Sequence, residues 1–130
     1  MYKINNNDIK IGKAYMIFGN AWMQKQNEEK IEKYSPRIWV EGLDDNNRMM
    51  VETFISDVEL NDLNVGEELD LKEYITDLIF FSGPDFGSAE FLGDGSESTK
   101  VIITKIAENK FNIKANIETI NLIYDVDICI

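Results

Sequence analysis

Apolar and polar residues alternate most regularly in the last third of the chain. From Phe111 to Ile117 and from Ile120 to Ile128, apolar side chains stand mainly at every second position. A period of two is typical of β-strands that bury one face. Residues 100–107, which are rich in β-branched side chains, predict one more strand before these. We therefore expect a three-stranded antiparallel meander over residues 99–129.

The short connections predict how these strands pair. With a turn at Glu118-Thr119, Ala115 pairs with Leu122 in the last strand. With a turn at Glu108-Asn109, Ala115 pairs with Ile102 in the first strand. Both registers gather the apolar residues on one face, and a slip of one residue would move polar groups onto that face.

The first half of the chain alternates less regularly. Residues 8–18 predict a strand with Ile9, Ile11, Tyr15 and Ile17 on one side. Two more strands are expected at residues 37–42 and 47–58, around a turn-forming Asp-Asp-Asn-Asn sequence. Residues 21–34, between the first two strands, fit a capped helix and a loop equally well.

Two later segments complete the expected architecture. Residues 71–78 favour a short helix, because Asp70 and Glu73 form a capping box, and the alternative is a strand over residues 67–75. Residues 82–98 are rich in glycine and predict a long irregular loop. We expect a mainly β fold: an antiparallel β-sandwich or a partly open barrel with a C-terminal three-stranded meander and one or two short helices.

Length and composition indicate one globular domain over residues 1–130. The polar N-terminus does not resemble a secretory signal, and no apolar run is long enough for a membrane-spanning helix. A single cysteine, Cys129, excludes an internal disulfide and fits a reducing compartment. We therefore expect a cytoplasmic protein that does not enter a membrane.

The residue inventory excludes most common catalytic chemistry. The chain has no histidine, which removes Ser-His-Asp and Cys-His nucleophiles, histidine-ligated zinc and the usual neutral-pH general base. One cysteine cannot by itself hold an iron–sulfur cluster, and no glycine-rich phosphate-binding motif is present. We expect a protein that is not an enzyme and carries no cofactor or metal.

Three weaker candidates survive this filter. Asp125 and Asp127 are expected on the same strand face, with α-carbons about 6–7 Å apart. Two carboxyl groups at that separation fit inverting glycoside hydrolysis, but solvated acids opposite Lys110 and Asn112 need no catalytic role. Cys129 lies beside the same two anions, which oppose a reactive thiolate, so we interpret it as a small apolar strand residue. Four acids of the 82–98 segment provide oxygens for calcium, although their spacing matches no EF-hand and also fits an ordinary turn: Asp85, Glu90, Asp94 and Glu97.

Charge is the most informative bulk property. The formal net charge is −11, and the excess of acid lies between residues 39 and 98. Residues 57–77, called the acidic block below, hold eight Asp or Glu residues against Lys72 alone. Such a surface repels nucleic acid and anionic lipid but attracts a basic protein, although acidity also simply keeps a small protein soluble.

The acidic block also contains apolar residues, from Val58 to Leu69. Apolar anchors ringed by acids suit an interface with a basic protein, such as that of an immunity-type inhibitor that neutralises a toxin or nuclease. Trp22 and Trp39 would add anchors, but we expect them in the core. The partner-binding residues expected are Asp57, Glu59, Asp62, Glu67, Glu68 and Asp70.

Two other kinds of binding protein remain open. One is a small-ligand or carbohydrate-binding β-domain, with Phe86 and Phe91 at the mouth of a pocket. The other is a structural subunit of a larger assembly, which would associate through a strand edge or an exposed apolar patch.

Overall fold

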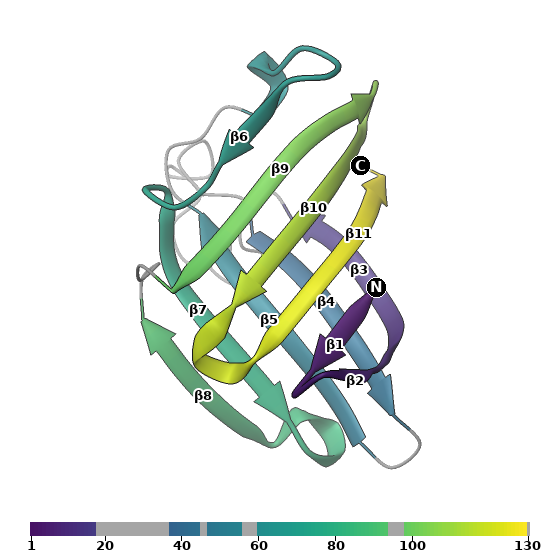
Figure 1. The fold of residues 1–130 in the computed structure, drawn as a ribbon, viewed down its shortest axis with the longest axis vertical. Helices are drawn as coiled ribbons and strands as arrows, with labels where there is room; N and C mark the ends of the chain where they lie inside the picture. Colours follow the sequence, from purple (N-terminus) through teal and green to yellow (C-terminus); the bar gives the residue numbers. More distant parts are fainter. Residues whose placement is uncertain (18–36, 45–46, 56–59, 94–97, 130) are drawn as a thin grey trace, which may run out of the picture.

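The computed structural model describes residues 1–17, 37–44, 47–55, 60–93 and 98–129. These residues form two antiparallel sheets that pack face to face, which confirms a mainly β, sandwich-like fold (Figure 1). The two sheets do not join into a closed barrel. Helix in the described residues is limited to three short 3-10 turns at Leu60–Asp62, Pro84–Phe86 and Glu118–Ile120.

Each sheet follows a simple strand order. The six-stranded sheet has the order β2-β1-β11-β10-β9-β6 and the five-stranded sheet the order β3-β4-β5-β7-β8. The strands of the first are β1 (Tyr2–Ile4), β2 (Asn7–Asp8), β6 (Glu68–Asp70), β9 (Thr99–Ala107), β10 (Lys110–Ile117) and β11 (Leu122–Cys129). Those of the second are β3 (Lys10–Ile17), β4 (Arg37–Asp44), β5 (Asn47–Ile55), β7 (Ile75–Ser82) and β8 (Ser88–Gly93).

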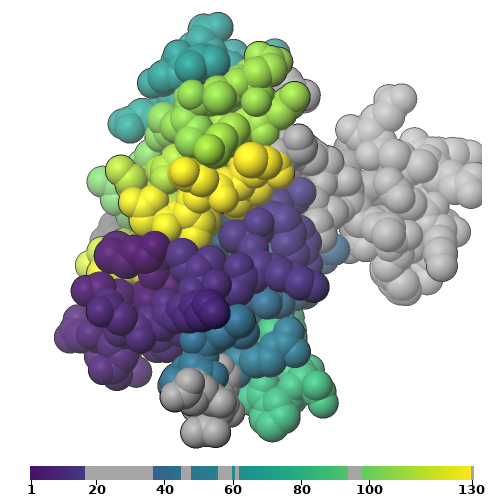
Figure 2. All heavy atoms as spheres, turned by 90° about the vertical axis from the view of Figure 1, so that its right-hand side faces the viewer, coloured from purple at the N-terminus to yellow at the C-terminus, as the bar shows by residue number. Residues whose placement is uncertain are grey.

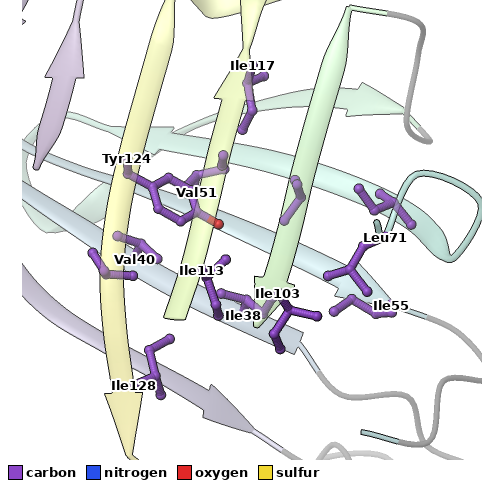
Figure 3. Packing of buried hydrophobic residues seen from close by; sticks show 14 of the residues in the cluster. Ile38, Val40, Val51, Ile55, Leu71, Ile103, Ile113, Ile117, Tyr124 and Ile128 are labelled. Atoms are coloured by element: carbon purple, nitrogen blue, oxygen red, sulfur yellow. The ribbon is translucent and has the colours of Figure 1, made fainter. Parts of the chain in front are cut away.

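The core lies between the two sheets. Ile38 and Val51 of the five-stranded sheet face Ile103 and Ile113 of the other, and none of the four is exposed (Figure 3). Each fully buried aliphatic side chain of this size stabilises the fold by about 1.5–3 kcal/mol. One packed core of this kind explains why the chain folds without disulfides.

The C-terminal meander is confirmed as β9, β10 and β11, but one register differs from the prediction. Ala115 pairs with Tyr124, two residues beyond the expected Leu122. The connection is longer than a two-residue turn, because a 3-10 turn and Asn121, with φ 50°, follow Ile117. A shift of two preserves the side-chain alternation, so the predicted apolar residues of β10 and β11 still face the core.

The predicted register of β9 against β10 is wrong by one residue, so it placed the wrong side chains of β9 in the core. Ala115 pairs with Val101 instead of Ile102, because the register shifts at a β-bulge beside Lys110. A shift of one residue reverses which side chains point inward. Val101 and Ile103 are therefore in the core, while Ile102 lies on the outer face of the sheet.

A second irregularity divides β3. The register against β4 shifts between Ile11 and Ala14, so Ala14 and Met16 pack toward the core together with Ile11. Tyr15 points to the opposite face. The expectation that Tyr15 shares a face with Ile9 and Ile11 is therefore wrong.

Two segments with weak patterns differ from their predictions. Residues 71–78 do not form a helix: Ile75 N donates to Leu71 O over one turn, and β7 then begins at Ile75 and pairs with β5. Residues 82–98 are not one irregular loop, since Ser88–Gly93 form β8, which pairs with β7. The strands expected at 37–42 and 47–58 are confirmed as β4 and β5, and residues 21–34 lie outside the described residues.

Segments from opposite ends of the sequence lie side by side. The N-terminal and C-terminal segments adjoin at the surface (Figure 2). Tyr2 of β1 pairs with Tyr124 of β11, and their rings stack with centroids 6.5 Å apart. A Cβ added at Gly42 of β4 would lie 2.6 Å from the Tyr2 ring, so this close approach requires glycine. The short strand β1 thus pairs with β11 in the six-stranded sheet and packs through Tyr2 against β4 of the five-stranded sheet.

Candidate functional site

The described part of the acidic block, residues 60–77, is anchored at both ends by leucines. Leu60 and Leu71 are fully buried in the core. Between them, β6 pairs with β9, and Gly66, at φ 94°, donates its main-chain N–H to Lys105 O at 2.7 Å. The segment therefore has a defined backbone at the edge of the six-stranded sheet, beside β9 (Figure 1).

The four described carboxylates that were predicted to bind a partner project into solvent. Asp62, Glu67, Glu68 and Asp70 are all exposed, and in the described part of the chain none of them lies within ion-pair distance of Lys or Arg. The remaining two residues predicted to bind the partner, Asp57 and Glu59, lie outside the described residues.

Two of these carboxylates also shape the local turns. Glu67 Oε1 accepts hydrogen bonds from the main-chain and side-chain nitrogens of Asn64. Asp70 Oδ1 accepts the main-chain N–H of Lys72 at 3.0 Å. Each carboxylate is therefore oriented by its own turn while it keeps its charge at the surface.

Most of the described apolar residues of the block pack against the core. Leu60 is a core residue, and Leu63 and Leu69 pack partly against the core. Val65 differs, because its side chain is 61% exposed between Asp62 and Glu67. Val58 lies outside the described residues. The apolar centre that the described structure offers a partner is therefore Val65.

The other sequence candidates have ordinary environments. Asp125 and Asp127 both accept hydrogen bonds from Asn112 Nδ2, at 2.7 and 2.9 Å, and Cys129 is exposed. Asp85 and Glu90 are exposed, whereas the other two calcium candidates lie outside the described residues. In the described residues no three His, Cys, Asp or Glu side chains are grouped so as to hold a metal ion.

The two phenylalanines expected at a ligand mouth also lie in different environments. Phe86 lies 4.6 Å beneath the Arg48 guanidinium, and Phe91 is 71% exposed on the edge strand β8.

The sequence reasoning missed a cluster on the outer face of the five-stranded sheet. Arg37, Trp39 and Glu41 alternate along β4 with core residues and therefore point away from the core. Across the strands, Trp39 pairs with Tyr15 on one side and with Glu52 on the other. The sequence does show polar residues alternating with Ile38 and Val40, but this alternation alone predicts a face exposed to solvent and not a buried cluster.

Glu41 and Glu52 are instead buried, with 6% and 4% of their surface exposed. Arg37 Nη1 donates to Glu52 Oε1 at 2.7 Å, and Arg48 Nη2 lies 3.6 Å from Glu41 Oε1. Burial raises the pKa of Glu52 above its ordinary value, and the Arg37 charge and hydrogen bond oppose that rise. Both carboxylates thus have a cation from the same sheet face.

Aromatic rings surround these ion pairs. The Tyr15 and Trp39 rings stack with centroids 5.4 Å apart, and the Arg37 guanidinium lies 5.7 Å from the Phe54 ring. Burial, followed by the nearby charges of Glu41 and Glu52, raises the pKa of Tyr15. The expectation that Trp39 belongs to the core is wrong, because it lies half-buried on this outer face.

Comparison of the chain with protein-family models, with curated proteins and with solved structures finds no match. Among the described residues, no helix is long and apolar enough to cross a membrane.

Proposed function

We propose that this chain is a non-enzymatic cytoplasmic protein that binds a basic protein partner through the acidic block. The observation that carries the proposal is the arrangement around Val65. Asp62, Glu67, Glu68 and Asp70 are exposed without a cation in the described residues, and Val65, which stands between Asp62 and Glu67 in the sequence, is exposed as well.

This arrangement suits capture of a cationic surface. Unpaired surface carboxylates accelerate encounter with a basic partner and orient it, and their effect weakens as salt screens the charges. An apolar side chain at the centre of such a patch adds contact area from which water is excluded. The anchored backbone reduces the ordering cost of binding, because Leu60 and Leu71 already hold the segment in place.

An immunity-type inhibitor is the concrete form we propose. Small size and a net charge of −11 support it, since a toxin or nuclease that acts on nucleic acid presents a basic surface. The inhibitor would cover that surface with its own carboxylates and would need no catalytic group.

The test compares two variants of equal charge in an affinity pull-down from native-host lysate. The first is Asp62→Asn/Glu67→Gln/Glu68→Gln/Asp70→Asn, whose amide side chains retain acceptor oxygens for the two local turns. The matched control neutralises four exposed acids elsewhere: Asp8→Asn/Glu90→Gln/Glu108→Gln/Glu118→Gln. Bound proteins are identified by mass spectrometry at low and at high salt.

We expect one basic protein to bind the unmodified chain and the control, and to bind the block variant at least about ten-fold more weakly. High salt should weaken the binding of all three proteins. An equal loss of affinity in both variants would mean that the partner responds to the net charge of the chain and not to the acidic block. Recovery of no protein at either salt concentration would contradict the proposal.

Val65→Ser provides an independent check. The exposed valine contributes to partner contact and not to the core, so this change should weaken binding without lowering the free energy of unfolding. Unchanged affinity would remove Val65 from the interface.

A further inference from the structure

A groove crosses the outer face of the six-stranded sheet next to the acidic block, since Asp70 of β6 pairs with Ile102 of β9, which lines the groove. It has a volume of about 330 Å³ and runs over β9, β10 and β11. Its lining includes Met1, Lys100, Ile102, Lys114, Asn116, Ile123 and the acid Asp125. Main-chain hydrogen bonds in both directions between Met1 and Asp125, at 2.9 and 2.8 Å, hold Met1 beside it.

The floor of this groove is apolar where the alternation predicts polar residues. Ile123 interrupts the alternation of β11 and is 37% exposed, and Met1 is 53% exposed. The β-bulge beside Lys110 turns Ile102 to this same outer face. Ile102 and Ile123 lie on strands on either side of β10, where Ile102 pairs with Lys114 and Ile123 pairs with Asn116. The two apolar side chains are therefore separated by one strand, about 10 Å apart or slightly more, with Lys114 and Asn116 between them.

Two cations border the floor. Lys100 pairs with Asn116 in the register, and Lys114 stands two residues before Asn116 on β10. The two lysines are therefore diagonal neighbours, about 7–8 Å apart at the backbone, and their flexible side chains can reach one bound group. Both are exposed, and neither forms an ion pair with another described residue.

Asp125, the acid that lines the groove, does not form an ion pair with Lys114. Asp125 lies directly opposite Lys114 in the register, yet its carboxylate accepts a hydrogen bond from Asn112 Nδ2 at 2.7 Å. Asn112 thus holds the Asp125 carboxylate beside Asp127, away from ion-pair distance to Lys114. The result is an apolar groove with two available positive charges in a strongly acidic protein.

We propose that this groove binds a small amphipathic carboxylate. The carboxylate would contact Lys100 and Lys114, and the apolar body would lie over Ile102 and Ile123. A long polyanion is disfavoured, because the net charge of −11 repels it over distances at which a small monoanion is only weakly affected. The groove is open to solvent, so we expect a dissociation constant on the order of 0.1–1 mM.

The experiment is a titration of the ¹⁵N-labelled full chain followed by amide chemical shifts. Octanoate is the probe, and 1-octanol and octylammonium provide the same alkyl chain without the negative charge. We expect octanoate to produce saturable shifts at residues 100–102, 114–116 and 123–125. Octanol should bind at least about five-fold more weakly, and octylammonium should leave these amides unchanged.

Variants separate the two parts of the site. Lys100→Gln/Lys114→Gln should weaken octanoate binding by about ten-fold, whereas the control Lys10→Gln/Lys72→Gln, with the same change in net charge at exposed lysines outside the groove, should not. Ile123→Asn should weaken octanoate and octanol alike. All three variants change exposed positions, and unchanged amide spectra away from the substitutions establish that they fold.

Three results would overturn the proposal. The first is the absence of saturable shifts at the groove with octanoate. The second is a lack of dependence on charge, seen either as equal affinity for octanoate and octanol or as an equal loss of octanoate affinity in the lysine variant and its control. The third is a dependence of the groove amides on protein concentration without probe, which would identify the groove as a contact between two copies of the chain.

Discussion

Two groups of carboxylates in this protein have opposite environments. Glu41 and Glu52 lie on the outer face of the five-stranded sheet, where they are buried and each has an arginine neighbour. Asp62 and Glu68, in the acidic block, are exposed and have no cation nearby in the described residues. The same functional group therefore contributes to the fold in one region and remains available for binding in the other.

The contrast follows from the cost of moving a charge out of water. A buried carboxylate is tolerated only with a nearby cation or hydrogen-bond donors, so its charge is already compensated and attracts no partner. An exposed carboxylate keeps its hydration and its long-range field. Net charge counts both kinds equally, which is why an acidic composition alone does not locate a binding surface.

Removal of the cation on the buried side should have the largest effect. In Arg37→Met the apolar stem is retained while Glu52 loses its hydrogen-bonded partner. We expect the free energy of unfolding in urea to fall by about 3 kcal/mol, because the buried carboxylate is left uncompensated.

Arg48→Met is the matched control for that change. The Arg48 side chain is 49% exposed and lies 3.6 Å from Glu41, which also accepts a hydrogen bond from the Lys13 main-chain N–H, so loss of Arg48 should cost less than loss of Arg37. Equal costs for the two variants would show that burial does not distinguish the two ion pairs.

The pH dependence of the free energy of unfolding should distinguish the contribution of Glu52 from that of the exposed acids. Its pKa is raised in the folded protein, so the folded state binds this proton more tightly than the unfolded chain does. Its contribution is therefore fully present at low pH and is lost as pH rises through the folded-state pKa. Relative to Glu52→Gln, the unmodified protein should lose stability as the pH rises above the ordinary pKa of a glutamate, about 4.3, measured by urea unfolding at each pH. A constant difference between the two proteins would contradict the raised pKa.

Neutralisation of the exposed group should have the smallest effect on stability. The variant Asp62→Asn/Glu67→Gln/Glu68→Gln/Asp70→Asn should unfold within about 0.5 kcal/mol of the unmodified protein, because the removed charges make no ion pair in the described residues. A large loss of stability would mean that these carboxylates serve the fold, and it would remove the contrast between the two groups.

Much of the fold could be predicted because the side-chain alternation of a strand is a local property. The apolar positions of β10 and β11, such as Ile113 and Val126, are in the core as their alternation indicated. Exposure of Asp62, Glu67, Glu68 and Asp70 also agrees with the sequence, since acids close together in a chain rarely bury without partners.

Other features depended on contacts between distant residues. The β-bulge beside Lys110 turned Ile102 outward and so formed the groove floor, although the local pattern placed Ile102 inside. Residues 71–78 satisfy helical spacing, but pairing with β5 made the second half of them, from Ile75 onward, a strand. Intrinsic preferences of short segments are small, and a whole strand of hydrogen bonds and buried side chains outweighs them.

The sequence by itself determined that the chain is mainly β, which faces of β10 and β11 are apolar, and that an acidic segment lies at the surface. Only the tertiary structure decided which carboxylates are compensated, where Trp39 lies, and that two lysines border an apolar groove. The physical reason is distance along the chain. Alternation acts between neighbouring residues, whereas the pairing of Arg37 with Glu52 and the approach of Met1 to Asp125 join residues that only the folded sheets bring together.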